Sequence, residues 1–247
     1  MTENAFWYTA RSGIELSLNE VHVWKTRLDP DALKLDSLST FLSAEERERA
    51  SQFTFEKDRA HFTVARATLR RLLGGYLGKP PKEIILGSLK NGKPVVAHAP
   101  NMPPLHFNLS HSHGLALFAF CLEHEVGVDL EKIRPEILHD QIQDRFFSTR
   151  EREEFAALPL ALRPEGFFLA WTRKEAYVKA HGDGLGASLR SFDVSLTPGK
   201  PAELHSPDDR NWRLYSLNPG KGFVGALVVE GQEHRMRLLE FDAQIGP

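Results

Sequence analysis

The sequence has few of the features that mark specialised classes of protein. A single cysteine, Cys121, excludes an internal disulfide framework and suits a reducing compartment, so we expect a cytoplasmic protein. The formal net charge is only -2, so no overall field points to nucleic acid or to a membrane surface. The N-terminus shows no pattern typical of an export signal, and the apolar run around Cys121 is far too short to cross a bilayer.

The common phosphate-binding and metal-binding motifs are also missing. The chain contains neither G-x-x-x-x-G-K-[ST] nor a G-x-G-x-x-G that follows a strand, and it has no His/Cys spacing typical of zinc. If phosphate is bound, basic side chains must therefore bind it. With 41% hydrophobic residues, the 247-residue chain can form a substantial core in one large domain or in two smaller ones.

Two segments of the chain resemble each other. FLSAEERERA begins at Phe41 and FFSTREREEF begins at Phe146, and five of ten positions match. Ser43 and Ser148 are candidate helix N-caps, with acidic residues in the turn that follows each. Chance similarity between two charged helices is the alternative.

The segments that follow each copy favour a duplication. A longer helical segment ending in glycine follows both copies, and strand-like runs come after each of these helices. We therefore predict two similar α+β halves, residues 1–123 and 124–247.

The stretch VGVDLEKI places two carboxylates in an otherwise apolar run. Side chains alternate along a strand, so Asp129 and Glu131 share a face, roughly 7 Å apart. They would repel by roughly 2 to 3 kcal/mol, which a bound cation would reverse. The alternative is that this face simply meets water.

A third carboxylate lies on a predicted helix. Trp171, Glu175 and Lys179 follow one another at a spacing of four residues and so form one stripe, while Lys174 adjoins Glu175. A surface ion pair beside a core tryptophan would explain the same stripe without any function.

Other segments offer donors for an anion. FNLSHS leads into a predicted hairpin turn, and its Ser110 and His111 can donate hydrogen bonds. Lys93 lies in NGKP, while Arg59 and Arg66 lie on one face of the first long helix. A solvated basic face and an ordinary turn histidine are the alternatives.

NGKP, FNLSHS, GVDLEK, FFSTRE and WTRKEAYVKAHGDGL occur in this order. The ordered set resembles the surfactin-type (Sfp-like) 4'-phosphopantetheinyl transferases from about Phe41 to Leu185. The resemblance implies a pseudo-dimeric α+β fold with the active site in the cleft between the halves. It also implies Mg²⁺-dependent transfer of 4'-phosphopantetheine from coenzyme A to a serine of an acyl or peptidyl carrier protein, with release of adenosine 3',5'-bisphosphate.

The family's functional residues correspond to positions in this sequence. The magnesium ligands correspond to Asp129, Glu131 and Glu175. The coenzyme A contacts correspond to Lys93, Ser110 and His111, with Arg59 and Arg66 matching more loosely. Lys179 and Lys174 would stabilise phosphate charge, and Glu175 or Glu151 would accept the serine proton, with Glu175 preferred. Where some relatives have a basic residue this chain has Glu46, which leaves Arg47 and Arg49 as substitutes.

Two other functions fit parts of the pattern. A different Mg²⁺-dependent phosphodiester enzyme could use three carboxylates, although the chain lacks a continuous basic stripe. A non-catalytic module that binds coenzyme A or a carrier protein would keep the fold and lose the acids. Because the three acids are present, we expect the transferase, acting as a monomer without a nucleic-acid or membrane partner.

Overall fold

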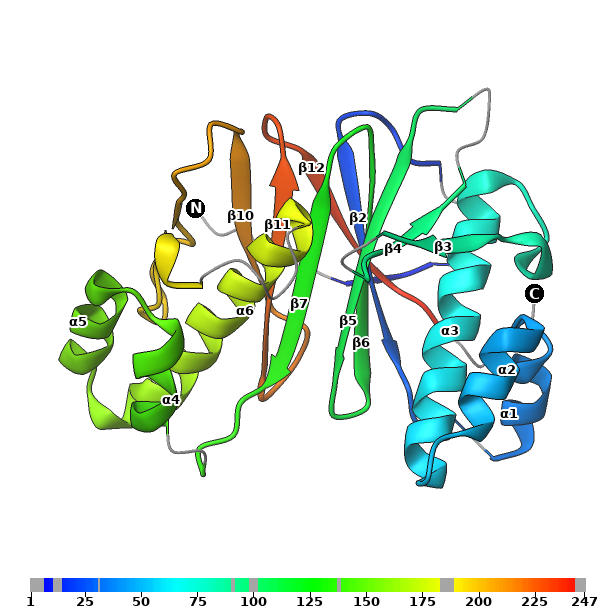
Figure 1. The fold of residues 1–247 in the computed structure, drawn as a ribbon, viewed down its shortest axis with the longest axis horizontal. Helices are drawn as coiled ribbons and strands as arrows, with labels where there is room; N and C mark the ends of the chain where they lie inside the picture. The colour runs from blue at the N-terminus through cyan, green and yellow to red at the C-terminus, as the bar shows by residue number, and fades with distance from the viewer. Residues whose placement is uncertain are drawn as a thin grey trace.

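The computed structural model describes residues 7–10, 15–30, 32–89, 92–97, 102–136, 139–182 and 189–242. Two α+β halves lie side by side, with their sheets at the centre of the molecule and one long helix, α3 or α6, on either side (Figure 1). The predicted α+β class is confirmed.

The elements follow one another in a similar order in both halves. The first half contains β1 (Tyr8–Thr9), β2 (Glu20–Arg27), α1 (Ala32–Ser39), α2 (Ala44–Ser51), α3 (Glu56–Leu77), β3 (Leu86–Ser88), β4 (Pro94–Val96), β5 (Leu105–Ser112) and β6 (Leu115–Leu122). The second contains β7 (Val126–Lys132), α4 (His139–Phe146), α5 (Thr149–Ala157), α6 (Arg163–His181), β8 (Asp193–Val194), β9 (Leu204–His205), β10 (Trp212–Leu217), β11 (Phe223–Glu230) and β12 (Arg235–Glu240). Short 3-10 turns lie at Pro81–Glu83, Leu160–Leu162 and Leu189–Ser191.

The strand pairing repeats as well. In the first half β2 pairs with β6 and β6 with β5, all antiparallel. In the second half β7 pairs with β11 and β11 with β10, again antiparallel. Each half is therefore a strand, a long helix and a hairpin whose second strand returns to the first strand, which confirms the pseudo-dimeric fold.

The two similar sequence segments form the same local structure. Ser43 and Ser148 each cap a short helix, α2 or α5, and each accepts a hydrogen bond from the backbone N–H three residues later. Glu46 and Glu151 complete the capping boxes by accepting the N–H of their respective serines. The predicted N-caps are confirmed.

The same two glutamates tie each short helix to the long helix of its half. Glu46 binds Arg70 of α3 at 2.6 Å, and Glu151 binds Lys174 of α6 at 2.7 Å. The repeat therefore extends to tertiary contacts, which chance similarity between charged helices would not produce.

The C-terminal strand crosses between the halves. β12 pairs in parallel with β2, so the larger sheet has the order β1-β12-β2-β6-β5. A division between residues 123 and 124 would cut this sheet, because one of its strands comes from the end of the chain. That division stays a prediction.

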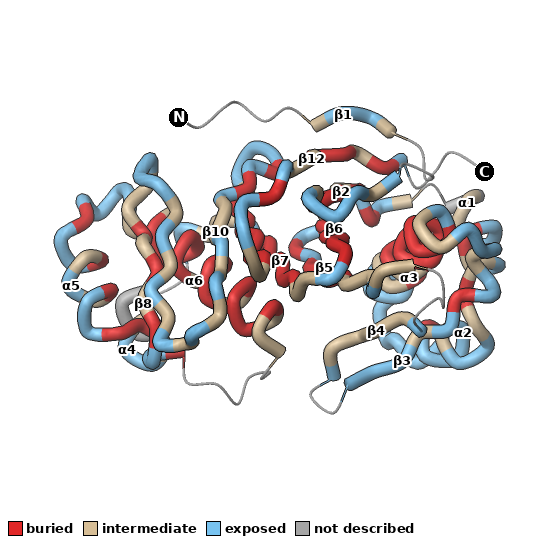
Figure 2. The backbone as a smooth tube through the Cα atoms, turned by 90° about the horizontal axis from the view of Figure 1, so that it is seen from above, coloured by how far each residue is buried: buried red, intermediate tan, exposed pale blue. Residues whose placement is uncertain are grey.

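Three apolar cores hold the layers together. One lies between α3 and the first sheet, one between α6 and the second sheet, and one between the two sheets (Figure 2). At Gly127 of β7, a Cβ atom would lie 2.1 Å from the carbonyl oxygen of Ala176. Glycine there lets α6 pack directly on β7, which brings the acids of the two elements together. No helix in the described part of the chain is long and apolar enough to cross a membrane.

Candidate active site

β7 carries Asp129 at the boundary between the halves. Val126, Val128 and Leu130 alternate into the core between the sheets, so Asp129 points the other way, towards α6. Its side chain is buried, and its Oδ1 accepts hydrogen bonds from Ser110 at 2.8 Å and from Lys179 at 2.6 Å.

Two carboxylate oxygens in this region are buried without a hydrogen-bond partner among the described residues. They are Oδ2 of Asp129 and Oε1 of Glu175. A buried, unpaired carboxylate oxygen is costly, and a hard cation that takes oxygen ligands would satisfy both. The two side chains therefore fit a magnesium ion.

The three acids influence one another electrostatically. Burial and then the charge of Asp129 raise the pKa of Glu175, against the opposing effect of Lys179. Burial also raises the pKa of Glu131, and the charge of Asp129 adds to it, while a hydrogen bond from Ser112 opposes both. A bound cation would reverse this repulsion.

The complete set of three ligands is not assembled. Among the described residues, no three His, Cys, Asp or Glu side chains lie together in a way that could hold a metal ion. Two of the acids have other partners: Lys179 supplies a positive charge to Asp129, and Glu131 accepts a hydrogen bond from Ser112 at 2.9 Å. The assignment of the three acids as ligands therefore stays a prediction.

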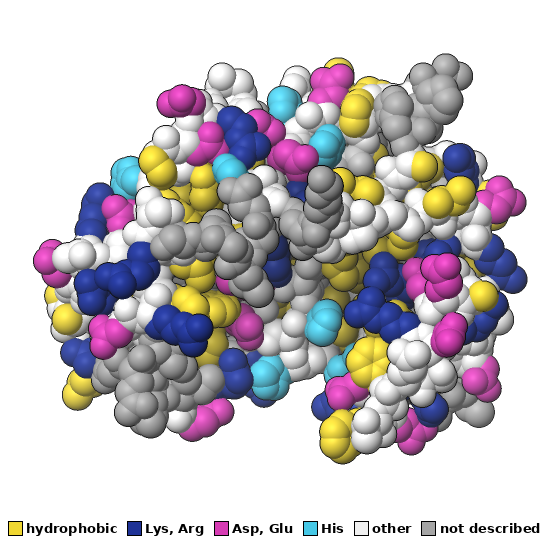
Figure 3. Space-filling view, viewed as in Figure 1, with side chains coloured by type: hydrophobic (Ala, Val, Ile, Leu, Met, Phe, Trp, Pro, Cys, Tyr) yellow, Lys and Arg dark blue, Asp and Glu magenta, His cyan; other side chains and the backbone are white. Residues whose placement is uncertain are grey.

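A large cavity opens on the first half beside these acids. Its volume is about 630 Å³, and Arg66 and His111, both predicted phosphate contacts, line it. Basic side chains gather on this face of the molecule, over α2 and α3 (Figure 3). The other charged or histidine side chains in its wall are Arg49, Lys57, Asp58, His61 and His113.

Lys57, His61 and His113 were missed by the sequence argument. Lys57 and His61 are four residues apart on α3 and share a face, but Arg66 lies five residues beyond His61, so a helical-face count from Arg66 does not reach them. Arg49 was considered only as a substitute, and it lines the cavity with its guanidinium over the Phe62 ring.

The cavity and the acids share a wall, which is the end of β5. Ser112 lines the cavity and donates to Glu131. His111 also lines the cavity, and its pKa is lowered by burial and then by the positive charges of Lys179 and His61. A ligand in the cavity could thus reach the acids without crossing another element.

Known families match both halves of the chain. The model of the 4'-phosphopantetheinyl transferase superfamily matches residues 125–228, and that of the 4'-phosphopantetheinyl transferase N-terminal domain matches residues 26–122. The 4'-phosphopantetheinyl transferase HetI of Nostoc is 39% identical over 91% of this chain and 94% of its own length. The transferases psf-1 of Bacillus pumilus and Sfp of Bacillus subtilis are 34% and 31% identical, over 77% and 73% of this chain and 81% and 80% of their own lengths.

This chain belongs to the 4'-phosphopantetheinyl transferase superfamily. The predicted family and enzyme class are thereby confirmed. All three relatives are named as transferases, which favours the transferase over the non-catalytic module and over another phosphodiester enzyme.

Two residues predicted for the chemistry of this transferase lie elsewhere. Glu151 and Lys174 form an ion pair in which both side chains are 1% exposed. Glu151 also accepts the backbone N–H groups of Ser148 and Val194, and Lys174 donates to the carbonyl oxygens of Leu189 and Phe192. These contacts fix α5 to α6, and they do not support Glu151 as a base or Lys174 as a phosphate contact.

Two predicted coenzyme A contacts also have other partners. Arg59 forms an exposed ion pair with Glu56, three residues earlier on α3, and lies outside the cavity wall. Ser110 points to Asp129 across the boundary between the halves. Arg47, a suggested substitute, donates to the carbonyl oxygen of Leu42.

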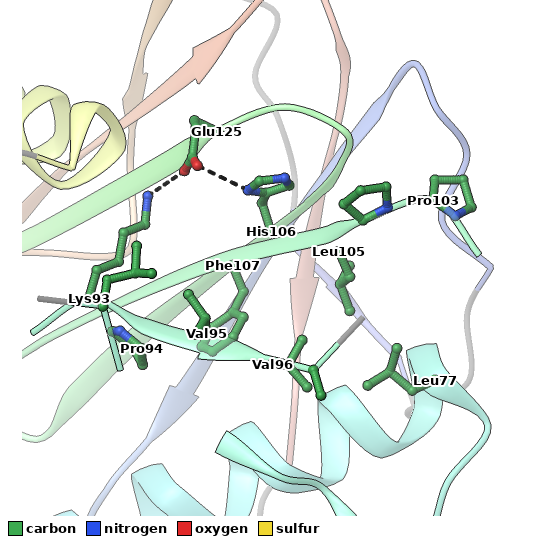
Figure 4. Close-up of a pocket in the computed structure, with 13 residues that line it drawn as sticks. Leu77, Lys93, Pro94, Val95, Val96, Pro103, Leu105, His106, Phe107 and Glu125 are labelled. Atoms are coloured by element: carbon green, nitrogen blue, oxygen red, sulfur yellow. Dashed lines mark hydrogen bonds and ion pairs between the residues drawn. The ribbon is translucent and has the colours of Figure 1, made fainter. Parts of the chain in front are cut away.

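Lys93 joins the two halves of the transferase. Its ammonium group binds Glu125 at 2.6 Å and also lies 3.2 Å from the carbonyl oxygen of Ala180, at the end of α6. His106 contacts the other oxygen of Glu125, and both side chains point to that carboxylate at the edge of an apolar cavity of about 250 Å³ (Figure 4). Contact of Lys93 with coenzyme A stays a prediction that requires this ion pair to open.

Trp171 packs in the core of the second half. Its ring lies 5.0 Å from that of Phe146 and 6.3 Å from that of Phe167. An ordinary core tryptophan, as the sequence allowed, explains these contacts.

Proposed function

We propose that this chain transfers the 4'-phosphopantetheine group from coenzyme A to a serine of a carrier protein, with coenzyme A phosphates in the basic cavity and Mg²⁺ at the acids. The observation that carries the proposal is the shared wall: His111 and Ser112 belong to the cavity, and the same strand contacts Asp129 and Glu131. Membership of the superfamily supports the reaction class.

The basic cavity suits the phosphates of coenzyme A. Arg66, Arg49 and Lys57 supply guanidinium and ammonium donors, and His111 supplies a ring N–H at the end nearest the acids. Arg66 is also close to Glu46, at 3.5 Å, and burial is the main cause that lowers its pKa. An arriving phosphate would share Arg66 with Glu46 or displace that contact.

The acids of β7 and α6 would hold the metal. Asp129 and Glu175 each offer a buried, unpartnered oxygen, and Glu131 would complete the set. When bound, Mg²⁺ neutralises negative charge on the pyrophosphate of coenzyme A.

The chain's own residues supply charge stabilisation and a base. In the reaction, the carrier serine oxygen forms a bond to the β-phosphorus, and the bond to the leaving adenosine 3',5'-bisphosphate breaks. Lys179 is placed to stabilise the negative charge on the leaving group, since its ammonium lies beside Asp129 at the same site. Glu175, with an unpartnered oxygen and a raised pKa, is the better candidate to accept the serine proton.

Mass spectrometry of apo carrier proteins tests this function. Incubation with the protein, coenzyme A and Mg²⁺ should add the mass of phosphopantetheine to at least one carrier from fatty acid, polyketide or nonribosomal peptide synthesis. The added mass should be absent with the Asp129→Ala variant. Unmodified carriers from all three sources would overturn the proposal. The identity of the carrier, the monomeric state and the cytoplasmic location stay predictions.

A further inference from the structure

Polar side chains of β5 bridge the two sheets. Strand β5 is at the edge of the five-stranded sheet and β7 is at the edge of the three-stranded sheet. Asn108 accepts from the backbone N–H of Val128 at 3.1 Å, Ser110 donates to Asp129 at 2.8 Å, and Ser112 donates to Glu131 at 2.9 Å. We call these three side chains of β5 the seam.

The seam follows from the period of a strand. Residues 108, 110 and 112 alternate with Leu109 and His111, so the first three side chains contact β7 while Leu109 and His111 line the basic cavity. Ser112, at the end of the strand, does both. The seam side chains are buried, and Ser112 also accepts the backbone N–H of Lys132 at 3.2 Å. Each serine thus has a defined orientation before any ligand arrives.

The seam leaves specific oxygens of the acids available. Ser110 and Lys179 both bind Oδ1 of Asp129, while its Oδ2 is buried with no partner among the described residues. Ser112 binds Oε2 of Glu131. Each serine therefore restrains the rotation of one carboxylate through a single oxygen.

We infer that Ser110 and Ser112 are positioning residues, which orient Asp129 and Glu131 across the boundary between the halves so that the remaining carboxylate oxygens can take a divalent cation. This inference rests on the proposed function, which gives the acids their cation. Side chains that orient metal ligands typically contribute 10- to 100-fold to metal affinity. The serines belong to the first half and the acids to the second, so the seam makes the site depend on how the halves are joined.

The test is calorimetric titration of the whole chain with Mn²⁺ alone, without coenzyme A. Ser110→Ala and Ser112→Ala should each bind Mn²⁺ about 10- to 100-fold more weakly than the unmodified protein. Ser112→Thr keeps the hydroxyl and should recover most of the affinity. Loss in the alanine variants with recovery in the threonine variant supports positioning, because a role in packing alone would not depend on the hydroxyl.

Ser216→Ala is the matched control. Ser216 lies on β10 in the second half and accepts a hydrogen bond from Arg173 at 2.9 Å, so the variant loses one bond to a charged group and none to the three acids. Its Mn²⁺ affinity should stay within about twofold of the unmodified protein. Thermal unfolding checks that each variant is folded, and Ser110→Cys, which keeps a small side chain but donates weakly, replaces Ser110→Ala if the latter does not fold.

The outcomes separate the inference from the proposed function. If the unmodified protein binds Mn²⁺ and both alanine variants bind it equally well, the positioning role is overturned and the proposed function stands. If the unmodified protein does not bind Mn²⁺, the metal assignment fails, and the positioning role fails with it.

Discussion

The two halves of the molecule share a topology and differ in what fills the space between the first strand and the long helix. In the first half Trp24 of β2 and Tyr76 of α3 meet there, joined by a 2.7 Å hydrogen bond, and Trp24 packs edge-on against Phe241. In the second half Asp129 of β7 meets Lys179 of α6. The duplicated layout thus encloses an aromatic cluster on one side and charged groups on the other.

The space between strand and long helix contributes to stability in the first half and holds the candidate chemical groups in the second. Trp24 is 1% exposed and lies in an apolar core, and a buried ring nitrogen beside it, Nε2 of His22, has no hydrogen-bond partner among the described residues. In the second half the buried atoms without partners in the described part of the chain include carboxylate oxygens of Asp129 and Glu175. Unpaired buried polar atoms reduce stability, and proteins keep them mainly where they bind something. Each half has one ion pair between its short helix and its long helix, Glu46 with Arg70 in the first and Glu151 with Lys174 in the second. Because the pair is repeated, we interpret it as part of the scaffold.

Substitution of Trp24 and of Asp129, one residue in the first strand of each half's repeated unit, gives the largest expected difference between the halves. Asp129→Ala should reduce transfer by more than about 10³-fold and leave the protein folded, because the residue contributes charge to the site. Trp24→Ala should instead lower the free energy of unfolding by about 3 to 5 kcal/mol through loss of core packing. Carrier modification rates and denaturant unfolding measure the two effects, and full Mg²⁺-dependent activity of Asp129→Ala would refute the role of this acid.

Glu175→Gln sharpens the assignment of the base. The amide keeps the shape of the side chain but loses its charge and nearly all its basicity, so the rate at saturating Mg²⁺ should fall by roughly 10²- to 10⁴-fold. If Glu175 only held the metal, high Mg²⁺ would restore much of the rate. Turnover measured across Mg²⁺ concentrations distinguishes these cases, and near-full recovery would remove Glu175 as the base.

Removal of one partner from the buried pair in the second half tests the scaffold. Glu151→Gln should lower the free energy of unfolding by about 3 to 5 kcal/mol, because Lys174 would be left charged and buried. The folded fraction should still transfer at close to the normal rate, since the contacts of the pair are with α5 and the segment around β8 and not with the three acids. Denaturant unfolding and the activity per folded molecule measure the two effects. A large loss of rate in a stable Glu151→Gln variant would mean that Glu151 is again a candidate base.

The basic cavity can be tested with two arginines of the same helix. Arg66→Ala should weaken coenzyme A binding by about 1.5 to 3 kcal/mol, the range for a hydrogen bond to a charged group. Arg59→Ala should change it by less than about 0.5 kcal/mol, because Arg59 is exposed and paired with Glu56 outside the cavity. Calorimetry with coenzyme A gives both values, and equal losses would mean that the ligand lies elsewhere on α3.

The contact of Glu125 with Lys93 and His106 should have the smallest effect. Burial raises the pKa of Glu125, but the hydrogen bonds and charges of His106 and Lys93 outweigh it and lower the pKa from 4.5 to about 2. A lowered pKa gives stability that is present above pH 4.5 and lost as the pH falls towards 2. Glu125→Gln should therefore lower the free energy of unfolding by about 1 kcal/mol or less at neutral pH. The variant should also lose less stability than the unmodified protein as the pH falls from 4.5 towards 2. The free energy of unfolding, measured between pH 2 and 7, gives this pH dependence for both proteins. If the contact does not stabilise the protein, Glu125→Gln and the unmodified protein will show the same pH dependence.

Local periodicity determined part of the site from the sequence alone. The two-residue period of a strand placed Asp129 opposite the core-facing valines, and the capping serines followed from short-range hydrogen bonding. The repeat of ten residues indicated two halves, because each copy begins the same kind of helix. These features depend on neighbours along the chain, which a single sequence displays directly.

Only the tertiary structure decided which of these residues meet. Glu151 follows a motif of the family, yet long-range packing encloses it with Lys174; Lys93 is held by Glu125 from the other half. The cavity wall of α3 and β5 combines residues forty or more positions apart, and β12 joins a sheet that begins near the start of the chain. Such contacts arise from how sheets and helices pack, and no periodicity within one segment encodes them.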